Sequence, residues 1–239
     1  MGTVFSKSAW ATVWQYRATF VNGLLNTLQS AVVGLLIAMT IGLALGLMAT
    51  GGRRALRTAA RVYVEFFQNT PLILQVCFLY YALAYSGVRI SVVTVGFVSL
   101  GLYHGAYVAE VVRAGIESIP FGQFDAARSQ GFAYADTMRY IILPQTVKII
   151  LPPLVNQVVA LIKNTSCLYI IGGADLIATT YNFVTGASTG GAYGPAYLVG
   201  GALFFLVCFP LSFFAGQWEK RLKARDQMTA PQGEEVTAG

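Results

Sequence analysis

The stretch Pro120 to Pro144, PFGQFDAARSQGFAYADTMRYIILP, is the only long polar segment of the chain with a membrane-length apolar run on each side. Residues 124–130 are good helix formers, and Gly131 follows where helices commonly end on a left-handed residue. Asp136 precedes apolar residues that recur at helical spacing, so we expect it to cap a second helix. The stretch therefore predicts a helix, a glycine corner and another helix.

The first predicted helix has a flat surface beside one aromatic side chain. Phe124 is followed by Asp125, Ala126 and Ala127, which are all small. Small side chains let a second backbone approach closely, whereas branched ones would hold it away. We therefore expect this helix to seat in a groove of another protein.

The composition is that of an integral membrane protein. Of 239 residues, 56% are hydrophobic and 11% are charged, against about 45–50% and about 25% in soluble domains. The mean hydropathy is +0.61. Cys77, Cys167 and Cys208 are scattered along the chain and imply neither a disulfide framework nor a metal site. The length fits one membrane domain with a few spans.

The net charge of +6 is distributed in a way that sets membrane topology. The 16 Lys and Arg residues concentrate in three segments, 53–61, 113–148 and 220–225. The exceptions are Lys7, Arg17, Arg89 and Lys163. Because cytoplasmic loops carry such an excess of basic residues, we expect these segments in the cytoplasm and no nucleic-acid partner.

The apolar runs predict an all-α integral membrane protein with five transmembrane helices, the N-terminus outside and the C-terminus inside. The predicted spans cover about 24–50, 62–85, 90–112, 145–162 and 197–217. Residues 1–19 include tryptophans and are expected at the membrane interface. Residues 20–222 form the membrane domain, and we expect 223–239 to be a disordered cytoplasmic tail.

Small residues and charge pairs predict contacts of the first three spans. A stripe of small residues at every fourth position predicts close packing, within this chain or against a second copy; it comprises Gly34, Ala38, Gly42, Gly46 and Thr50. Arg61 with Glu65, and Glu110 with Arg113, have the spacing of ion pairs on one helix face.

The second half of the chain contains a predicted break and a predicted cap. Pro152 and Pro153 remove two backbone donors, so we expect them to break the fourth span. Asp175 is expected to cap an amphipathic helix. The Thr- and Gly-rich segment 185–194 is expected to lie on the outer side of the membrane, opposite the cytoplasm.

The stretch 120–144 resembles the cytoplasmic coupling loop of ATP-binding-cassette importer permeases. That loop has a Glu-Ala-Ala triplet, a glycine and an Ile-x-Leu-Pro ending, which stand here as Asp125–Ala127, Gly131 and Ile141–Pro144, with Asp in place of Glu. Residues 151–166, LPPLVNQVVALIKNTS, resemble the corresponding span of polar amino acid permeases. Residues 64–71, VEFFQNTP, resemble the start of the second span in the same permeases. Here Gln68 and Asn69 replace the usual Arg-Gly. The resemblance covers about Asn22 to Leu222.

The resemblance implies a permease subunit of an ATP-driven importer for polar amino acids of the histidine, glutamine and arginine type, in the bacterial cytoplasmic membrane. It implies three kinds of protein partner: an ATPase subunit dimer, a second permease (identical or related) and an extracytoplasmic solute-binding protein. In the coupling loop, 113–148, the residues implied at the ATPase interface are Phe124, Asp125, Ala126, Ala127 and Gly131.

The chain itself is expected to be no enzyme and to bind no cofactor. It contains no Gly-x-x-x-x-Gly-Lys-Ser/Thr phosphate loop, and it has a single histidine. ATP and Mg would accordingly be bound by the partner ATPase.

The substrate path is expected to use the few polar side chains within the spans, because an amino acid carries charges that need partners in the membrane. The candidates are His104, Tyr107, Asn156, Gln157 and Lys163. For His104 the alternative is a buried histidine bonded to a neighbouring helix, and for Lys163 a side chain that only snorkels to the interface. The path residues could also belong to the permease partner.

Two other functions remain open from the sequence. One is a self-sufficient channel or ion-coupled carrier, for which five spans without an internal repeat form an unusually small unit. The other is a permease of the same architecture that carries a different small solute.

Overall fold

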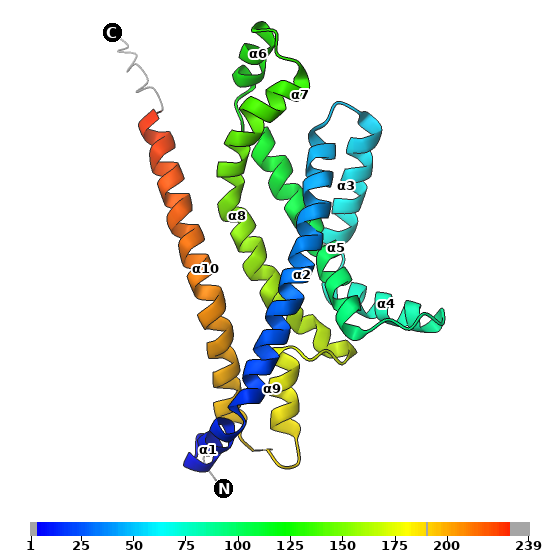
Figure 1. Ribbon diagram of the computed structural model, residues 1–239, viewed down its shortest axis with the longest axis vertical. Helices are drawn as coiled ribbons and strands as arrows, with labels where there is room; N and C mark the ends of the chain where they lie inside the picture. Colours follow the sequence, from blue (N-terminus) through cyan, green and yellow to red (C-terminus); the bar gives the residue numbers. More distant parts are fainter. Residues whose placement is uncertain (1–3, 190, 230–239) are drawn as a thin grey trace, which may run out of the picture.

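The structure, a computed structural model, describes residues 4–189 and 191–229 (Figure 1). Its α-helices are α1 Lys7–Gln15, α2 Arg17–Thr50, α3 Arg54–Gln68, α4 Leu72–Tyr85, α5 Val92–Glu117, α6 Phe121–Ser129, α7 Tyr134–Asp136, α8 Leu143–Asn164, α9 Leu176–Thr185 and α10 Tyr193–Thr229. A π-helical turn, η1 (Thr137–Ile142), joins α7 to α8, and a 3-10 helix, η2 (Thr165–Ile171), follows α8. The described part of the chain contains no strand, so the all-α prediction is confirmed.

Within residues 4–189 and 191–229, four helical segments are long and apolar enough to cross a membrane. They are Arg17–Thr50, Val92–Glu117, Tyr134–Ile171 and Tyr193–Leu222. A fifth span would require α3 and α4 to act together, although they meet at an angle of 98°. The long helices run roughly along one axis in Figure 1, with α6 and α7 at one end and α1 and α9 at the other.

The small-residue stripe packs inside this chain, between α2 and α5. A Cβ added at Gly42 would lie 2.4 Å from Cβ of Val108, and one at Gly46 would lie 2.6 Å from Cβ of Val112. A glycine of α5 makes the same kind of close contact with α2, because a Cβ added at Gly101 would lie 2.4 Å from the side chain of Ile37. Glycine is therefore required on both helices for their close approach, which confirms the predicted packing within the chain.

The second predicted span, 62–85, is not one continuous helix. Helix α3 begins at Arg54 and ends at Gln68, and α4 begins only after Pro71. Proline cannot donate a backbone hydrogen bond and restricts the residue before it, which ends the helix at Asn69. In Figure 1, α3 lies beside α2 and α5, whereas α4 projects sideways from the bundle.

The predicted break at Pro152 and Pro153 is wrong, because both prolines lie inside the continuous helix α8. Their fixed φ is compatible with a helix, so the lost donors do not interrupt it. The capping hydrogen bond predicted for Asp136 does not form either. Asp136 ends α7 and holds the N-cap position of η1, but its side chain accepts no capping hydrogen bond there.

At the other end, the predicted cap of α9 is confirmed. The carboxylate of Asp175 accepts hydrogen bonds from the backbone N–H of Ile177 at 3.0 Å and of Ala178 at 3.2 Å. Burial raises the pKa of Asp175, while these amide donors act in the opposite direction. Helix α10 continues to Thr229, so the first residues of the predicted tail are helical, and 230–239 lie outside the described residues.

Candidate functional sites

The loop 120–144 forms a helix and a glycine corner, as predicted. Helix α6 ends in a Schellman arrangement: the N–H of Phe132 donates to the carbonyl of Ala127 at 3.1 Å, and the N–H of Gly131 donates to that of Arg128 at 3.0 Å. Gly131 has φ +82°, the left-handed conformation that favours glycine. The corner turns the chain back from α6 into α7 (Figure 1).

Helix α6 presents only some of its candidate interface residues to the outside. Asp125, Ala126 and Gly131 are exposed. Ala127 is 2% exposed and faces the protein's own interior. Phe124 is half-buried and packs against a cluster that includes Ile116 and Ile142.

Exposed aromatic side chains lie beside this tip, and no sequence pattern had singled them out. Phe121 is 75% exposed and Tyr134 is 58% exposed. The rings of Phe121 and Phe124 stack with their centroids 6.3 Å apart. The tip therefore offers a polar and small-residue strip on α6 with aromatic side chains beside it.

A polar network at mid-bundle joins α5 to α8 through His104, which is 2% exposed. Nδ1 of His104 is 3.3 Å from Oε1 of Gln157, and Nε2 is 3.1 Å from the amide nitrogen of Asn164. An amide nitrogen only donates and an amide oxygen only accepts. The network therefore fits a neutral imidazole with its proton on Nδ1, which donates to Gln157 and accepts from Asn164.

The other candidate path residues lie apart from this network or at its margin. Tyr107 shares a hydrogen bond of 3.0 Å with the hydroxyl of Tyr103. Asn156 and Lys163 are exposed and stand seven residues apart on α8, hence on one helix face. The structure thus brings His104 and Gln157 together and leaves Asn156 and Lys163 free of them. Asn164, which the sequence analysis missed, completes the network from the last turn of α8.

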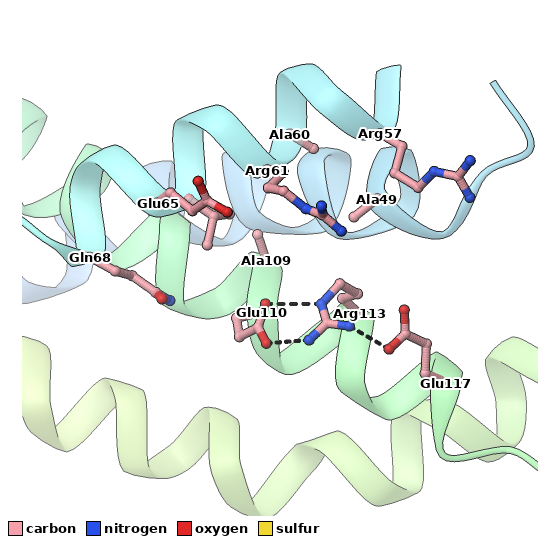
Figure 2. Close-up of a pocket in the computed structure, with 11 residues that line it drawn as sticks. Ala49, Arg57, Ala60, Arg61, Glu65, Gln68, Ala109, Glu110, Arg113 and Glu117 are labelled. Carbon is pink, nitrogen blue, oxygen red and sulfur yellow. Dashed lines mark hydrogen bonds and ion pairs between the residues drawn. The ribbon is translucent and has the colours of Figure 1, made fainter. Parts of the chain in front are cut away.

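A charged pocket of about 320 Å³ lies between α3 and α5 (Figure 2). The predicted pair of Glu110 and Arg113 is confirmed, and Glu117 also pairs with Arg113. The predicted pair of Arg61 and Glu65 is wrong, because their charged groups lie more than 4.0 Å apart. Helical spacing alone does not hold two long, exposed side chains together, since such a pair is worth only about 0.3–0.5 kcal/mol.

The described residues include no group of three or more His, Cys, Asp or Glu side chains that would hold a metal ion. All three cysteines are unpaired and half-buried. The polar chemistry of the described chain therefore lies in the α6 tip, the His104 network, the free face of α8 and the charged pocket.

The family model and the relatives that match this chain are all membrane components of transport systems. A family model described as binding-protein-dependent transport system inner membrane component matches residues 38–224. The "Probable glutamine ABC transporter permease protein GlnM" of Bacillus subtilis is 38% identical over 85% of this chain and 93% of its own length. The glutamine transport system permease protein GlnP of Escherichia coli is 32% identical over 90% of this chain and 97% of its own length.

Solved structures show the same architecture. A crystal structure of an amino acid ABC transporter with histidines superimposes with a TM-score of 0.81 at 32% identity, covering 89% of this chain and 98% of that one. An inward-facing structure of the MetNI methionine ABC transporter gives a TM-score of 0.65 at 18% identity, covering 85% of this chain and 98% of that one, and shows the fold alone.

Proposed function

The chain belongs to the family of binding-protein-dependent transport system inner membrane components, and from this premise we propose that it carries a polar amino acid through the bacterial cytoplasmic membrane. It is the membrane-spanning permease subunit of an ATP-driven importer, not an enzyme. Relatives named for glutamine align along most of their length, and this supports an amino acid as cargo.

We assign each partner protein to an exposed surface of this chain. One subunit of an ATPase dimer, which binds ATP and Mg, would dock on α6 of this chain through Asp125, Ala126 and Gly131. A second permease, identical or related, completes the path, and a solute-binding protein delivers the amino acid at the end that carries α1 and α9. In this arrangement the N-terminal segment 1–19 lies at the outer side of the membrane and residues 20–222 form the permease domain. The tail 223–239 lies in the cytoplasm.

One observation supports the docking role most directly. Ala126 is exposed in the middle of α6, whereas Ala127 is buried, so the helix presents Ala126 and Asp125 outward. Phe124 and Ala127 would then position α6 from behind, because they pack into this chain. The coupling surface is therefore narrower than the five residues that the resemblance implies.

Substitution of Ala126 tests the proposal in the complete transporter, reconstituted in liposomes with its ATPase and binding protein. Ala126→Trp would force α6 out of its groove, so we expect ATP hydrolysis stimulated by the binding protein, and uptake of L-glutamine, to fall at least about tenfold. Ala59→Trp, at an exposed position of α3 that lies outside α6 and away from the end that carries α1 and α9, is the matched control.

The outcomes separate the alternatives. Full stimulated ATP hydrolysis by Ala126→Trp would contradict docking at this surface. Uptake of L-glutamine by the wild type without ATP would indicate a channel or ion-coupled carrier. Uptake of another small solute instead of any amino acid would leave the architecture unchanged and replace the cargo.

A further inference from the structure

The charged pocket between α3 and α5 contains more charge than its ion pairs account for. Three arginines, three glutamates and one glutamine line it, together with small or apolar residues (Figure 2). The polar lining residues are Arg57, Arg61, Glu65, Gln68, Glu110, Arg113 and Glu117.

On the α5 side the charges are already matched. Nε of Arg113 donates to Oε2 of Glu110 at 3.0 Å, and its terminal nitrogens bond to Glu110 and Glu117. Figure 2 shows this guanidinium held between the two carboxylates of its own helix. Arg113 therefore has little capacity left for a ligand.

On the α3 side the charges are available. Arg57, Arg61 and Glu65 follow one another at intervals of four residues, which places them on one helix face. Within the residues that the structure describes, none of the three takes part in an ion pair. The wall of the pocket thus offers two free guanidinium groups and, one turn further along α3, one free carboxylate.

We propose that this pocket binds the charged head of the transported amino acid on its way to the cytoplasm, an inference that rests on the function proposed above. The guanidinium groups of Arg61 and Arg57 receive the carboxylate, Glu65 receives the ammonium, and Gln68 offers a donor and an acceptor to a polar side chain. A volume of about 320 Å³ is at the lower end for small-molecule sites, which suits one amino acid.

The balance of charges favours a zwitterion over a simple ion. Three arginines against three glutamates leave the lining without net charge, so a lone anion or a lone cation gains little overall. A molecule with both charges finds both partners at separate points of one wall. A lipid phosphate would use the arginines but would leave Glu65 without a role.

The position of the pocket agrees with a release site. It extends along α3 from Arg57 to Gln68 and along the last turns of α5, which lead to the end of the molecule that carries α6 (Figure 1). Tyr107 stands one turn before Glu110 on α5, between the pocket and the His104 network. Substrate would reach the pocket after the mid-bundle residues.

Binding of ligand analogues to matched variants tests the assignment of each charge. Radiolabelled L-glutamine is bound to the permease–ATPase complex in phosphatidylcholine nanodiscs without ATP or binding protein. The competitors are unlabelled L-glutamine and 4-carbamoylbutanoate, which lacks only the ammonium group. In the wild type we expect the second competitor to bind about tenfold more weakly, because it loses a charge-assisted hydrogen bond.

In Glu65→Gln, that difference between the two competitors should disappear, while L-glutamine itself binds about tenfold more weakly. Arg61→Gln should weaken both competitors equally, since both carry the carboxylate. Arg54→Gln removes an exposed charge of α3 that does not line the pocket, so it should change neither affinity.

The inference is overturned if Glu65→Gln keeps the wild-type preference for the ammonium, or if the wild type shows no saturable binding. Displacement of L-glutamine only by anionic phospholipid would also overturn it, in favour of a headgroup site. Uptake by the complete wild-type transporter is measured in parallel. Uptake without pocket binding refutes this inference alone, whereas absence of any amino acid uptake refutes the proposed function.

Discussion

At the scale of single residues, the structure divides the polar side chains of α8 into two groups with different environments. Gln157 and Asn164 are engaged with His104, which corresponds to the structural alternative for that histidine. Asn156 and Lys163 are exposed and take no part in this network. Of the five candidate path residues, Lys163 is therefore the one whose charge is free to meet an incoming carboxylate.

Lys163→Met tests this role because it keeps the length of the side chain and removes its charge. If the ammonium group receives the carboxylate of the amino acid, uptake should fall at least about tenfold while assembly and basal ATP hydrolysis persist. Lys220→Met, which removes an exposed charge from the far end of α10, provides the control. Wild-type uptake by Lys163→Met would show that the lysine only snorkels to the interface.

The His104 network shows how far single residues can be interpreted from sequence. An intramembrane histidine predicts either a path or a hydrogen bond between helices, and the sequence does not choose between them. Asn164 attracts no attention, because an asparagine at the end of a helix is common. Its role becomes visible only when α5 and α8 lie side by side and put the amide 3.1 Å from the imidazole.

At the scale of elements, the contact of α2 with α5 depends on glycine. In Gly42→Ala, the new methyl group would lie 2.4 Å from Cβ of Val108 and 2.9 Å from the carbonyl oxygen of Gly105, so the helices must separate. We expect a loss of about 1–3 kcal/mol in the free energy of unfolding, measured as a lower melting temperature in detergent.

Gly216→Ala is the matched control for this prediction. Gly216 is also helical, but nothing lies within 4 Å of a Cβ added there. Alanine is the better helix former by about 0.5–1 kcal/mol, so this variant should be as stable as the wild type or more so. Equal melting temperatures for Gly42→Ala and the wild type would contradict the close packing.

The elements that sequence predicts well here are those whose signals are local. Asp175 caps α9 through its own neighbours, and Gly131 turns the chain because its φ is positive. The misjudged elements depend on distant packing. Pro152 and Pro153 remain in a continuous α8. The run 62–85 bends at Pro71, where α3 and α4 meet at an angle of 98°.

At the scale of the whole molecule, the distribution of charge agrees with the arrangement of the helices. The basic segment 53–61 belongs to the start of α3, and 128–148 extends from the end of α6 to the start of α8. These elements reach the same end of the bundle as the C-terminal part of α10 (Figure 1). Since basic residues gather on the cytoplasmic side, this end is expected to be the cytoplasmic one.

Cysteine labelling tests that orientation in a background in which Cys77, Cys167 and Cys208 are replaced by serine. Ser188→Cys lies after α9 and Gly122→Cys lies on α6, at opposite ends of the molecule, and both positions are exposed. A membrane-impermeant maleimide should label position 188 in intact cells and position 122 only in inverted membrane vesicles. The reverse pattern would place α6 outside the cell, where no ATPase subunit could dock, and would refute both the topology and the coupling role of the loop.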